Sequence, residues 1–305
     1  MNTEELTEQV PCNLCGSSDS SVRFLSMDGW PIDAAGHYAA STDKFGAYGT
    51  IRRCRTCGLV YTSPRIKPER MFDGYSANED TEYIAECDSR SMNAYLALAV
   101  IRRHAQGGRL LDVGCNTGFF LNAARLSYEV AGVEPSAWAR RFANEKLRLD
   151  ITADSLDQAK FPDACFDVVT LIDVIEHLPD PKAALREIAR VTKPGGILYL
   201  VTPDVESLSA RLLRGEWWGL RPAHIYYFSP RTLRRLLYEC GFEVVTASSY
   251  GRIFTWQYWL SRLSNYPRPL YWAVETVVRV LGIQDKFLYL DTRDSMQFVA
   301  RRKPV

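Results

Sequence analysis

The sequence predicts an α/β protein with a parallel, doubly wound sheet and a small cysteine-rich module in front of it. Three observations carry this prediction. Two Cys-x-x-Cys pairs lie within the first 65 residues, and apolar strand-like runs alternate with amphipathic helical stretches from Arg109 onward. An aromatic segment then interrupts the alternation before a last strand. We therefore expect units at 1–65, 66–106 and 107–305, with a helical insertion at 250–290.

Composition excludes several classes of protein. The chain has 305 residues, of which 47% are apolar and 24% charged, enough for one sizeable core plus a module. A formal net charge of +1 gives no long-range attraction to nucleic acid. The polar, acidic start "MNTEELTEQV" is unlike a secretory signal peptide, and no apolar run approaches the roughly 20 residues that span a bilayer. We expect a cytoplasmic protein; its oligomeric state stays open.

The unit 1–65 contains two cysteine pairs, "PCNLCGS" and "RRCRTCGLV". Without an export signal, such pairs favour a metal over disulfides. They resemble a zinc ribbon, in which four thiolates surround a structural ion and supply folding energy to a segment with little core of its own. Free buried thiols are the alternative, and His37 could replace one cysteine. The ligands we favour are Cys12, Cys15, Cys54 and Cys57.

The unit 66–106 is predicted to be a helical cap or linker. A polar stretch with Tyr75 and Tyr83 precedes an amphipathic helix. The apolar face expected for that helix consists of Met92, Tyr95, Leu96, Ala99 and Val100.

Strands and helices then alternate. The strand-like runs are "RLLDV", "EVAGVE", "LDITA", "FDVVTLI", "GILYLVT", "FEVVTA" and the final "SMQFVARR". The helix "DPKAALREIARV" begins after its N-cap Asp180 and stops at Pro-Gly-Gly, and Ser229 caps "PRTLRRLLYECG".

The stretch "RLLDVGCNTGFFL" reads as a buried strand, a tight glycine turn and the start of a helix. Free amides at such a helix N-terminus would suit an anionic or nucleotide ligand. The turn lacks the Lys-Ser/Thr of a phosphate-binding loop and the G-x-G-x-x-G spacing of a dinucleotide site. Glu134, about 20 residues beyond Gly114, can accept hydrogen bonds from ribose hydroxyls. We infer a nucleoside ligand without a pyrophosphate.

These motifs resemble the class I S-adenosylmethionine (SAM) methyltransferases, which have a Rossmann-like sheet. "LLDVGCNTGFF" is similar to that family's first motif, "AGVEPS" to its ribose-binding motif and "TADSLD" to its adenine loop. "DVVTLIDVIEHLPDP" and "KPGGILYLVTPD" resemble its fourth motif and the following strand. The resemblance implies a SAM-dependent methyltransferase whose cofactor contacts are Asp112, Gly114, Cys115 and Gly118, then Glu134, Pro135 and Ser136, and finally Asp154, Ser155 and Asp173.

Within that set, Asp112 and Gly114 should border the methionine part of SAM and Asp173 its amino group, with Asp154 and Ser155 at the adenine. The alternative for Asp112 and Asp173 is that each merely caps a neighbouring helix. For Glu134 the alternative is a solvated turn carboxylate.

Two histidines are candidates for the general base that removes the acceptor proton. His224 lies in "GLRPAHIYYFSP", in the loop after the fifth strand, and His177 lies in "IEHLPDP", after the fourth. A histidine suits this role because its ordinary pKa lies near neutrality. We rank His224 first, because the loop after the fifth strand folds over the acceptor in class I enzymes. The alternative for each is a ring that bonds only to backbone.

"CRTCGLVYTSP" ahead of such a domain is similar to bacterial sugar and polysaccharide-pathway methyltransferases. That similarity implies a small-molecule acceptor: a sugar, a nucleotide-sugar or a glycan intermediate, lipid-linked forms included. Sugar C-methyltransferases carry a further C-terminal domain for which this chain has no room, so O-methylation is favoured. The rival hypotheses are an RNA or protein methyltransferase that uses the ribbon as a grip, and a SAM-binding protein without catalysis.

The segment 250–290 is rich in Trp, Tyr and Arg. Such a composition fits an amphipathic surface that makes peripheral contact with a membrane. The other interpretation is an aromatic cap on the substrate pocket or a dimer face.

Overall fold

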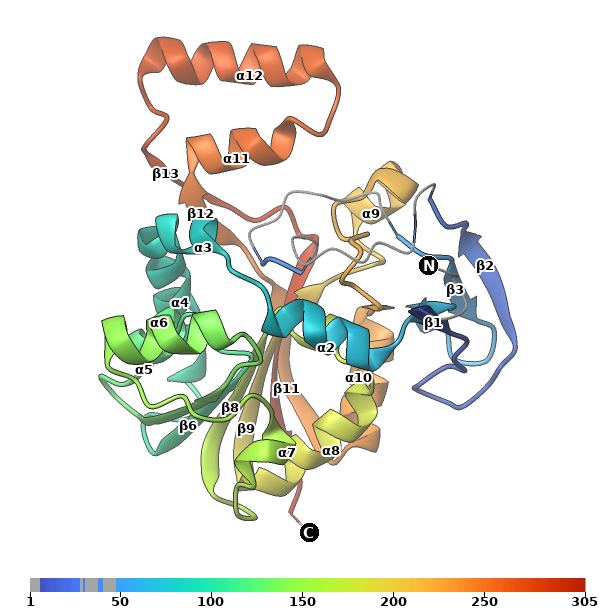
Figure 1. The fold of residues 1–305 in the computed structure, drawn as a ribbon, viewed down its shortest axis with the longest axis vertical. Coiled ribbons are helices and arrows are strands. Elements are labelled where there is room, and N and C mark those ends of the chain that lie inside the picture. Colours follow the sequence, from blue (N-terminus) through green and yellow to red (C-terminus); the bar gives the residue numbers. More distant parts are fainter. Residues whose placement is uncertain (1–5, 28–29, 31–37, 41–47, 305) are drawn as a thin grey trace.

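The computed structural model describes residues 6–27, 30, 38–40 and 48–304. Its centre is a six-stranded sheet in the order β11-β14-β9-β8-β6-β7, seen edge-on at the lower centre of Figure 1. Strands β6, β7, β8 and β9 are parallel, and β14 runs antiparallel between β9 and β11. The strands are β6 (Arg109–Val113), β7 (Glu129–Val133), β8 (Phe166–Ile172), β9 (Thr192–Pro203), β11 (Phe242–Ser249) and β14 (Ser295–Arg302).

Helices cover both faces of this sheet, as a doubly wound fold requires. Successive strand residues point to opposite faces: Leu110 packs with α4 and α5, whereas Leu111 packs in the core that contains α8 and α10. The helices are α4 (Cys87–Ile101), α5 (Phe119–Ala124), α6 (Ala137–Leu147), α7 (Leu156–Ala159), α8 (Pro181–Val191) and α10 (Pro230–Glu239). The predicted caps are confirmed, since Asp180 accepts from the amide of Ala183 and Ser229 forms a capping box with Thr232.

Three local predictions were wrong. The sheet is mixed rather than parallel, because the last strand, β14, inserts antiparallel. "LDITA" forms only a single bridge, between Val133 and Ala153, instead of a strand. The helix of α8 ends at Val191, ahead of the Pro-Gly-Gly, and β9 begins at Thr192.

The helix α4 exists, but it buries a different face from the one predicted. Its buried residues are Ser89, Asn93, Ala94, Ala97, Leu98 and Ile101, whereas Tyr95 is 51% exposed. The small side chains of Ala94 and Ala97 lie in the core shared with α5. Asn93 is buried because its amide side chain bonds both backbone groups of Ile253. Hydrophobicity alone therefore selected the wrong stripe of this helix.

The N-terminal unit is a small antiparallel sheet of order β10-β4-β3-β2, with a β1-β5 pair beside it. Its strands are β1 (Thr7–Glu8), β2 (Ser20–Phe24), β3 (Ile51–Cys54), β4 (Val60–Thr62) and β5 (Arg65–Ile66). The fourth strand, β10 (Tyr226–Tyr227), is distant in the sequence from the other three and pairs with β4. This unit is joined to the main sheet by α2 (Pro68–Ser76) and α3 (Thr81–Ala85), and α9 (Leu208–Leu213) lies above it in Figure 1.

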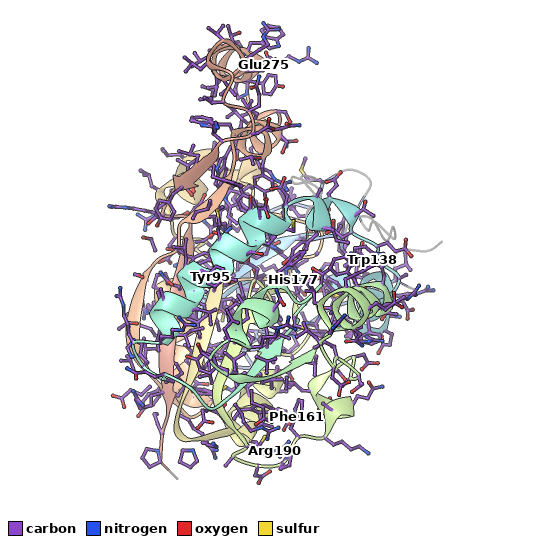
Figure 2. The ribbon with its side chains drawn as sticks, turned by 90° about the vertical axis from the view of Figure 1, so that its left-hand side faces the viewer. Tyr95, Trp138, Phe161, His177, Arg190 and Glu275 are labelled. Carbon is purple, nitrogen blue, oxygen red and sulfur yellow. The ribbon has the colours of Figure 1, made fainter. Side chains whose placement is uncertain are left out.

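The insertion projects from the body at the top of Figure 1. It consists of α11 (Trp256–Leu263) and α12 (Arg268–Leu281), carried on the strand pair β12 (Arg252–Thr255) and β13 (Phe287–Leu290). The sequence analysis predicted its helices but not this strand pair. Figure 2 marks Glu275 on α12, well away from His177 in the body. Among the described residues, no helix is both long and apolar enough to cross a membrane.

Candidate active site

The loop after β6 makes its turn with two glycines in the left-handed region, Gly114 (φ 74°) and Gly118 (φ 81°). A side chain at Gly114 would place its Cβ 2.7 Å from a methyl group of Val174, and one at Gly118 would lie 2.5 Å from Leu149. Both positions therefore require glycine for backbone conformation and for space. Gly118 is the N-cap of α5.

The amides of residues 114–118, in the loop ahead of α5, are all hydrogen-bonded within the protein. Gly114 and Cys115 both donate to the carbonyl of Val133, at 2.8 and 3.1 Å. Asn116 donates to Glu134 Oε2 at 2.8 Å. The next two amides are also used: Thr117 donates to Asn116 Oδ1 and Gly118 to the carbonyl of Cys115. The loop itself therefore offers few donors to a phosphate, in agreement with a ligand that lacks a pyrophosphate.

Glu134 lies directly after β7 and is only 8% exposed. Its Oε1 accepts from the amide of Ser136 and its Oε2 from that of Asn116, each at 2.8 Å. These two bonds fix the plane of the carboxylate, and burial raises its pKa. Each oxygen keeps a second lone pair for a ligand hydroxyl. The carboxylate is thus a hydrogen-bond acceptor of fixed orientation at the cavity wall, and not a solvated turn residue.

Two further acids stand at strand ends. Asp112 is 4% exposed, accepts from Thr170 Oγ1 at 2.6 Å, and burial raises its pKa to about 7. Asp173 follows β8 with a left-handed backbone (φ 55°), and its Oδ1 pairs with Arg252 at 2.8 Å. Neither carboxylate caps a helix, the alternative that the sequence left open. The Asp173–Arg252 pair was not foreseen, because Arg252 belongs to the insertion.

These residues surround one large cavity of about 1050 Å³. Of the ten residues predicted to contact the cofactor, nine line it; Gly118 lies behind the wall. Asp154 and Ser155 line it at the start of α7, where Ser155 is the N-cap. Both histidines line the same cavity, as do α11 and the loop before β10. Pockets that bury one drug-sized ligand measure about 300–1,000 Å³, and this cavity lies at the upper end of that range, which leaves room for a nucleoside together with a second small molecule.

His177 and His224 meet ring against ring, with 4.6 Å between centroids and 80° between planes. His224 is 4% exposed and its Nδ1 lies 2.8 Å from the carbonyl of Gly219. Since a carbonyl only accepts, Nδ1 carries the ring proton and Nε2 holds the free lone pair. His177 is half-buried, and its Nδ1 lies 2.7 Å from the Tyr75 hydroxyl and 3.0 Å from the carbonyl of Ala223.

Burial keeps both rings neutral at pH 7. It lowers the pKa of His177 to about 4, and it lowers the pKa of His224 well below the ordinary value, with His177 and Arg221 adding to the effect. Glu176 lies beside them, 1% exposed, with Oε2 bonded to Thr202 and Oε1 without a hydrogen-bond partner in the described part of the chain. Burial and the charge of Asp173 raise the pKa of Glu176 to about 8.

Sequence reasoning missed several residues of this end of the cavity: Tyr75, Glu176, Arg90, Arg221 and Tyr258. Glu176 had a signal in the Glu-His pair of "IEHLPDP". The others come from separate segments and carry no local motif.

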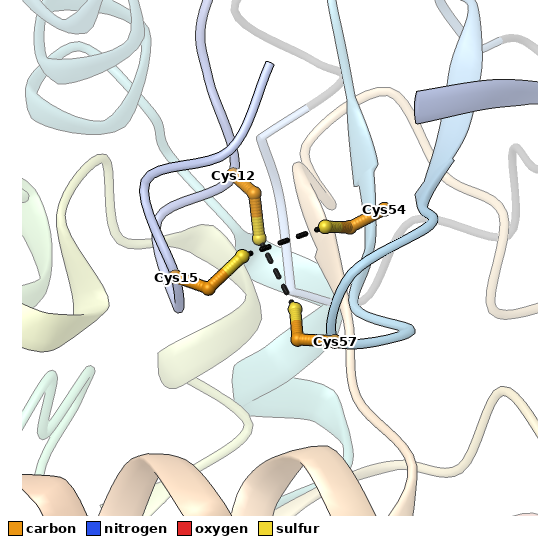
Figure 3. Close-up of side chains that lie close together, drawn as sticks. All are labelled: Cys12, Cys15, Cys54 and Cys57. Atoms are coloured by element: carbon orange, nitrogen blue, oxygen red, sulfur yellow. Dashed lines mark hydrogen bonds between the residues drawn. The ribbon is translucent and has the colours of Figure 1, made fainter. Parts of the chain in front are cut away.

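The four cysteines of the N-terminal unit converge, as Figure 3 shows. Cys12 Sγ lies 3.4 Å from Cys57 Sγ, and Cys15 Sγ lies 3.5 Å from Cys54 Sγ, with all four sulfurs within 4.8 Å of one another. A tetrahedral ion with bonds of about 2.3 Å would place its sulfurs about 3.8 Å apart, so the cluster fits such an ion. Gly16 and Gly58 follow the two Cys-x-x-Cys pairs with positive φ. His37 lies outside the described residues.

The comparisons with known proteins agree on the catalytic unit. Residues 87–247 match the family described as Methyltransferase domain. An uncharacterized methyltransferase of Schizosaccharomyces pombe is 36% identical over 47% of this chain and 56% of its own length. A ubiquinone biosynthesis O-methyltransferase of Cereibacter sphaeroides is 28% identical over 66% of this chain and 83% of its own. The chain spans about half the length of the first curated relatives it matches.

Among solved structures, the complex of the Haloferax volcanii Trm112 methyltransferase activator with a methyltransferase matches with a TM-score of 0.54 and 21% identity, over 76% of this chain and 98% of that one. Such a match supports the fold alone. The family match extends over the sheet and the cavity at its strand ends, and it defines the class of protein as a methyltransferase. The chain belongs to the methyltransferase-domain family.

Proposed function

We propose that this enzyme methylates a hydroxyl oxygen of a small molecule, with a sugar, nucleotide-sugar or glycan intermediate as the first choice. The observation that carries the proposal is the shape of the cavity. It continues from the Gly114 loop past the histidine pair to the insertion, and α11 covers its far end. A pocket walled in this way suits a small acceptor better than a folded RNA or protein. The named O-methyltransferase activity of relatives supports the same choice.

SAM would occupy the part of the cavity beside the loop after β6. The fixed carboxylate of Glu134 is placed to accept from ribose hydroxyls, and Pro135 and Ser136 continue that wall. Asp154 and Ser155 would meet the adenine, and Asp112, Gly114 and Cys115 the methionine part. Asp173 would face the donor's amino group with its second oxygen, since Arg252 already bonds Oδ1. When bound, SAM supplies a methyl group attached to a sulfonium sulfur. That sulfur is the leaving group, and it needs no metal or acid to leave.

The protein's remaining task is to receive the acceptor's proton. We assign this to the histidine pair, in which the bonds of His224 to Gly219 and of His177 to Ala223 each leave Nε2 as the basic atom. We rank His224 first because its loop follows the fifth strand, the loop that folds over the acceptor in class I enzymes. His177 is the runner-up and presents more surface to the cavity. Neutral rings at pH 7 are in the form that accepts a proton, and burial, by lowering their pKa values, makes them weaker bases than an ordinary histidine.

We further propose that Cys12, Cys15, Cys54 and Cys57 hold a structural zinc ion in the unit 1–65. The unit 66–106 forms a cap, and the unit 107–305 carries catalysis with its insertion at 250–290. The sulfur geometry supports the ion. Within the unit 66–106, α4 shares a core with α5 and lies inside the matched range 87–247.

The decisive experiment is incubation of the enzyme with methyl-labelled SAM and an extract of small molecules, RNA and protein, followed by mass spectrometry. We expect label in a product of small mass that carries one added methyl group on oxygen. Label recovered only in RNA or protein would overturn the proposal. SAM binding without transfer to any fraction would instead indicate a binding protein.

A further inference from the structure

The end of the cavity beside the insertion has a wall of mainly apolar side chains. Aromatic rings of α11, Trp259 among them, form part of this wall, and Trp218 adds a ring from the loop before β10. Aliphatic side chains of α11, α12 and β13 complete it: Leu260, Leu263, Val274 and Leu290. The insertion therefore supplies an apolar lining at a distance from the carboxylates that face the donor.

The indole N–H groups of this wall are already bonded within the protein. Trp259 Nε1 donates to the carbonyl of Leu288 at 3.3 Å. Trp218 Nε1 donates to Asp294 Oδ2 at 2.6 Å. A buried tryptophan whose N–H has a partner offers a ligand only the apolar faces and edges of its ring. These two rings thus act as apolar surface in the cavity.

The charged side chains at this end are also engaged with other parts of the chain. Arg252 pairs with Asp173 at 2.8 Å. Arg262 lies 4.6 Å over the ring of Tyr258, and both Arg262 and Arg221 have further interactions within the protein. Because these charges already have partners, the larger part of the surface left to a ligand here is apolar.

Such a lining is poorly suited to a sugar ring and well suited to a hydrocarbon chain. Each hydroxyl of a sugar that leaves water needs a hydrogen-bond partner, and an unpaired hydroxyl weakens binding. Flat aromatic faces can stack on a sugar, but the branched side chains of Leu263 and Val274 have no such face. An apolar chain needs no partner and gains affinity with each group that it removes from water.

The apolar surface continues from the cavity onto the outside of α12. Leu270, Val274, Val277 and Leu281 are spaced at i, i+4, i+7 and i+11, so they form one stripe along this helix. Val274 lines the cavity, whereas the other three are exposed. The stripe therefore extends along the arm that projects from the body in Figure 1. A chain longer than the cavity can leave it along this surface.

We infer that the methyl acceptor is an amphiphile, whose apolar chain lies between α11 and α12 while its hydroxyl-bearing head lies beside His177 and His224. This inference rests on the proposed function and specifies its substrate class. A glycan linked to a lipid and a free lipophilic alcohol or phenol share the apolar chain, so both fall within the class. A nucleotide-sugar, which lacks such a chain, falls outside it.

The test uses n-hexyl, n-heptyl and n-octyl β-D-glucoside as probes, each below its micelle concentration. They are titrated by calorimetry into full-length enzyme saturated with S-adenosylhomocysteine, with glucose as the probe without a chain. We expect saturable binding whose affinity rises about three- to fourfold with each added methylene, the usual gain from burying that group. Glucose should show no measurable binding.

The matched variants place the chain. Val274→Ser and Leu263→Ser change apolar side chains of the cavity wall, and each should weaken octyl glucoside about fivefold or more. Val280→Ser is the control, because Val280 is an exposed valine of the same helix outside the cavity wall, and it should bind like the wild type. SAM affinity and melting temperature, measured for each variant, should stay near the wild-type values.

Either of two results would overturn the inference: no saturable binding, or an affinity that does not rise with chain length. Both are measured on the wild type, so they decide the matter even where a serine variant is unstable. Equal weakening in Val280→Ser and Val274→Ser would also overturn it, because the probe would then bind to the outer surface of α12.

Methyl labelling separates this inference from the proposed function. Labelled product should partition into organic solvent. Label in a water-soluble sugar or nucleotide-sugar would overturn the inference and leave the proposed function standing, whereas label only in RNA or protein would overturn both. Mild acid then distinguishes the two sources: it releases labelled glycan into water from a lipid-linked diphosphate, and it leaves a free lipophilic alcohol or phenol in the solvent.

Discussion

The amide of Thr62, in the N-terminal unit, donates to the carbonyl of Ile225 at 2.9 Å, one residue beyond His224. The contact continues as a strand pair, since β10 joins the edge of β4. On its other side, Ile225 donates to the carbonyl of Glu176 at 3.0 Å. The cysteine-bearing unit and the loop that carries His224 therefore share one small sheet. Disorder in the cysteine-bearing unit should therefore also disorder the loop that carries His224.

The proposed zinc site makes a direct prediction. Elemental analysis of enzyme purified without added metal should find about one zinc per chain. Cys12→Ser and Cys54→Ser should lose the zinc and lower the melting temperature, because ion binding supplies folding energy to this unit. Cys87→Ser, which changes a cysteine outside the cluster, should keep the zinc and the wild-type melting temperature.

Absence of zinc, with all eight cysteines titrating freely in the native protein, would contradict this site. A second ion per chain would point instead to Glu176, His177 and His224, whose candidate ligand atoms lie within 4.8 Å of one another.

The proposed ribose contact predicts that Glu134→Ala weakens SAM binding by about 1.5–3 kcal/mol, the usual value of a hydrogen bond to a charged group. The substitution also removes the acceptor for the amides of Asn116 and Ser136, so the loop itself should loosen. Glu129→Ala is the matched control, because Glu129 is exposed and lies on β7, the strand that Glu134 follows. Calorimetry measures the SAM affinity of the two variants. Unchanged SAM affinity in a folded Glu134→Ala enzyme would mean that the donor binds elsewhere.

The parts of this enzyme that could be predicted from sequence are those encoded within a few residues. The glycine turn after "RLLDV", the capped helices and the two cysteine knuckles each depend on local backbone chemistry, and each lies where expected. The family resemblance then placed nine cofactor candidates on one cavity wall.

What failed depends on partners distant in the chain. The buried face of α4 is set by Asn93, whose side chain bonds the backbone of Ile253 in the insertion. The loop amides are satisfied by Val133 and Glu134 from the next strand. The cavity wall beside the insertion forms only when α4, β12, α11 and the His224 loop meet. No periodicity within a single segment reports such meetings.

The insertion makes a prediction about surfaces. Side chains of α11, such as Tyr258 and Trp259, face the cavity and cap it, whereas α12 leaves apolar side chains in solvent. Trp272 is 58% exposed and Val280 is 77% exposed. We expect the enzyme to sediment with anionic vesicles at low salt, and Trp272→Ser with Val280→Ser to abolish this without changing SAM affinity. No binding to vesicles, together with a dimer in analytical ultracentrifugation that the same pair of changes dissolves, would identify α12 as a dimer face.

The sharpest prediction concerns the proton of the acceptor hydroxyl. A hydroxyl attacks poorly until its proton can leave, so the base must lie on the acceptor side of the donor methyl. Nε2 is the nitrogen left to act in both rings, because Nδ1 of His224 bonds the carbonyl of Gly219 and Nδ1 of His177 bonds that of Ala223. We rank His224 first because its loop follows the fifth strand, the loop that folds over the acceptor in class I enzymes. With an acceptor in hand, His224→Gln should lower kcat by about 10²–10⁴-fold, the usual contribution of a positioned base. SAM affinity and melting temperature, measured beside it, should stay near the wild-type values, and Tyr75→Phe should have a much smaller effect on kcat.

If His177→Gln loses turnover while His224→Gln keeps it, the two roles are reversed. If both variants stay active, neither histidine is the base, and the proton leaves to water or to another group of the cavity.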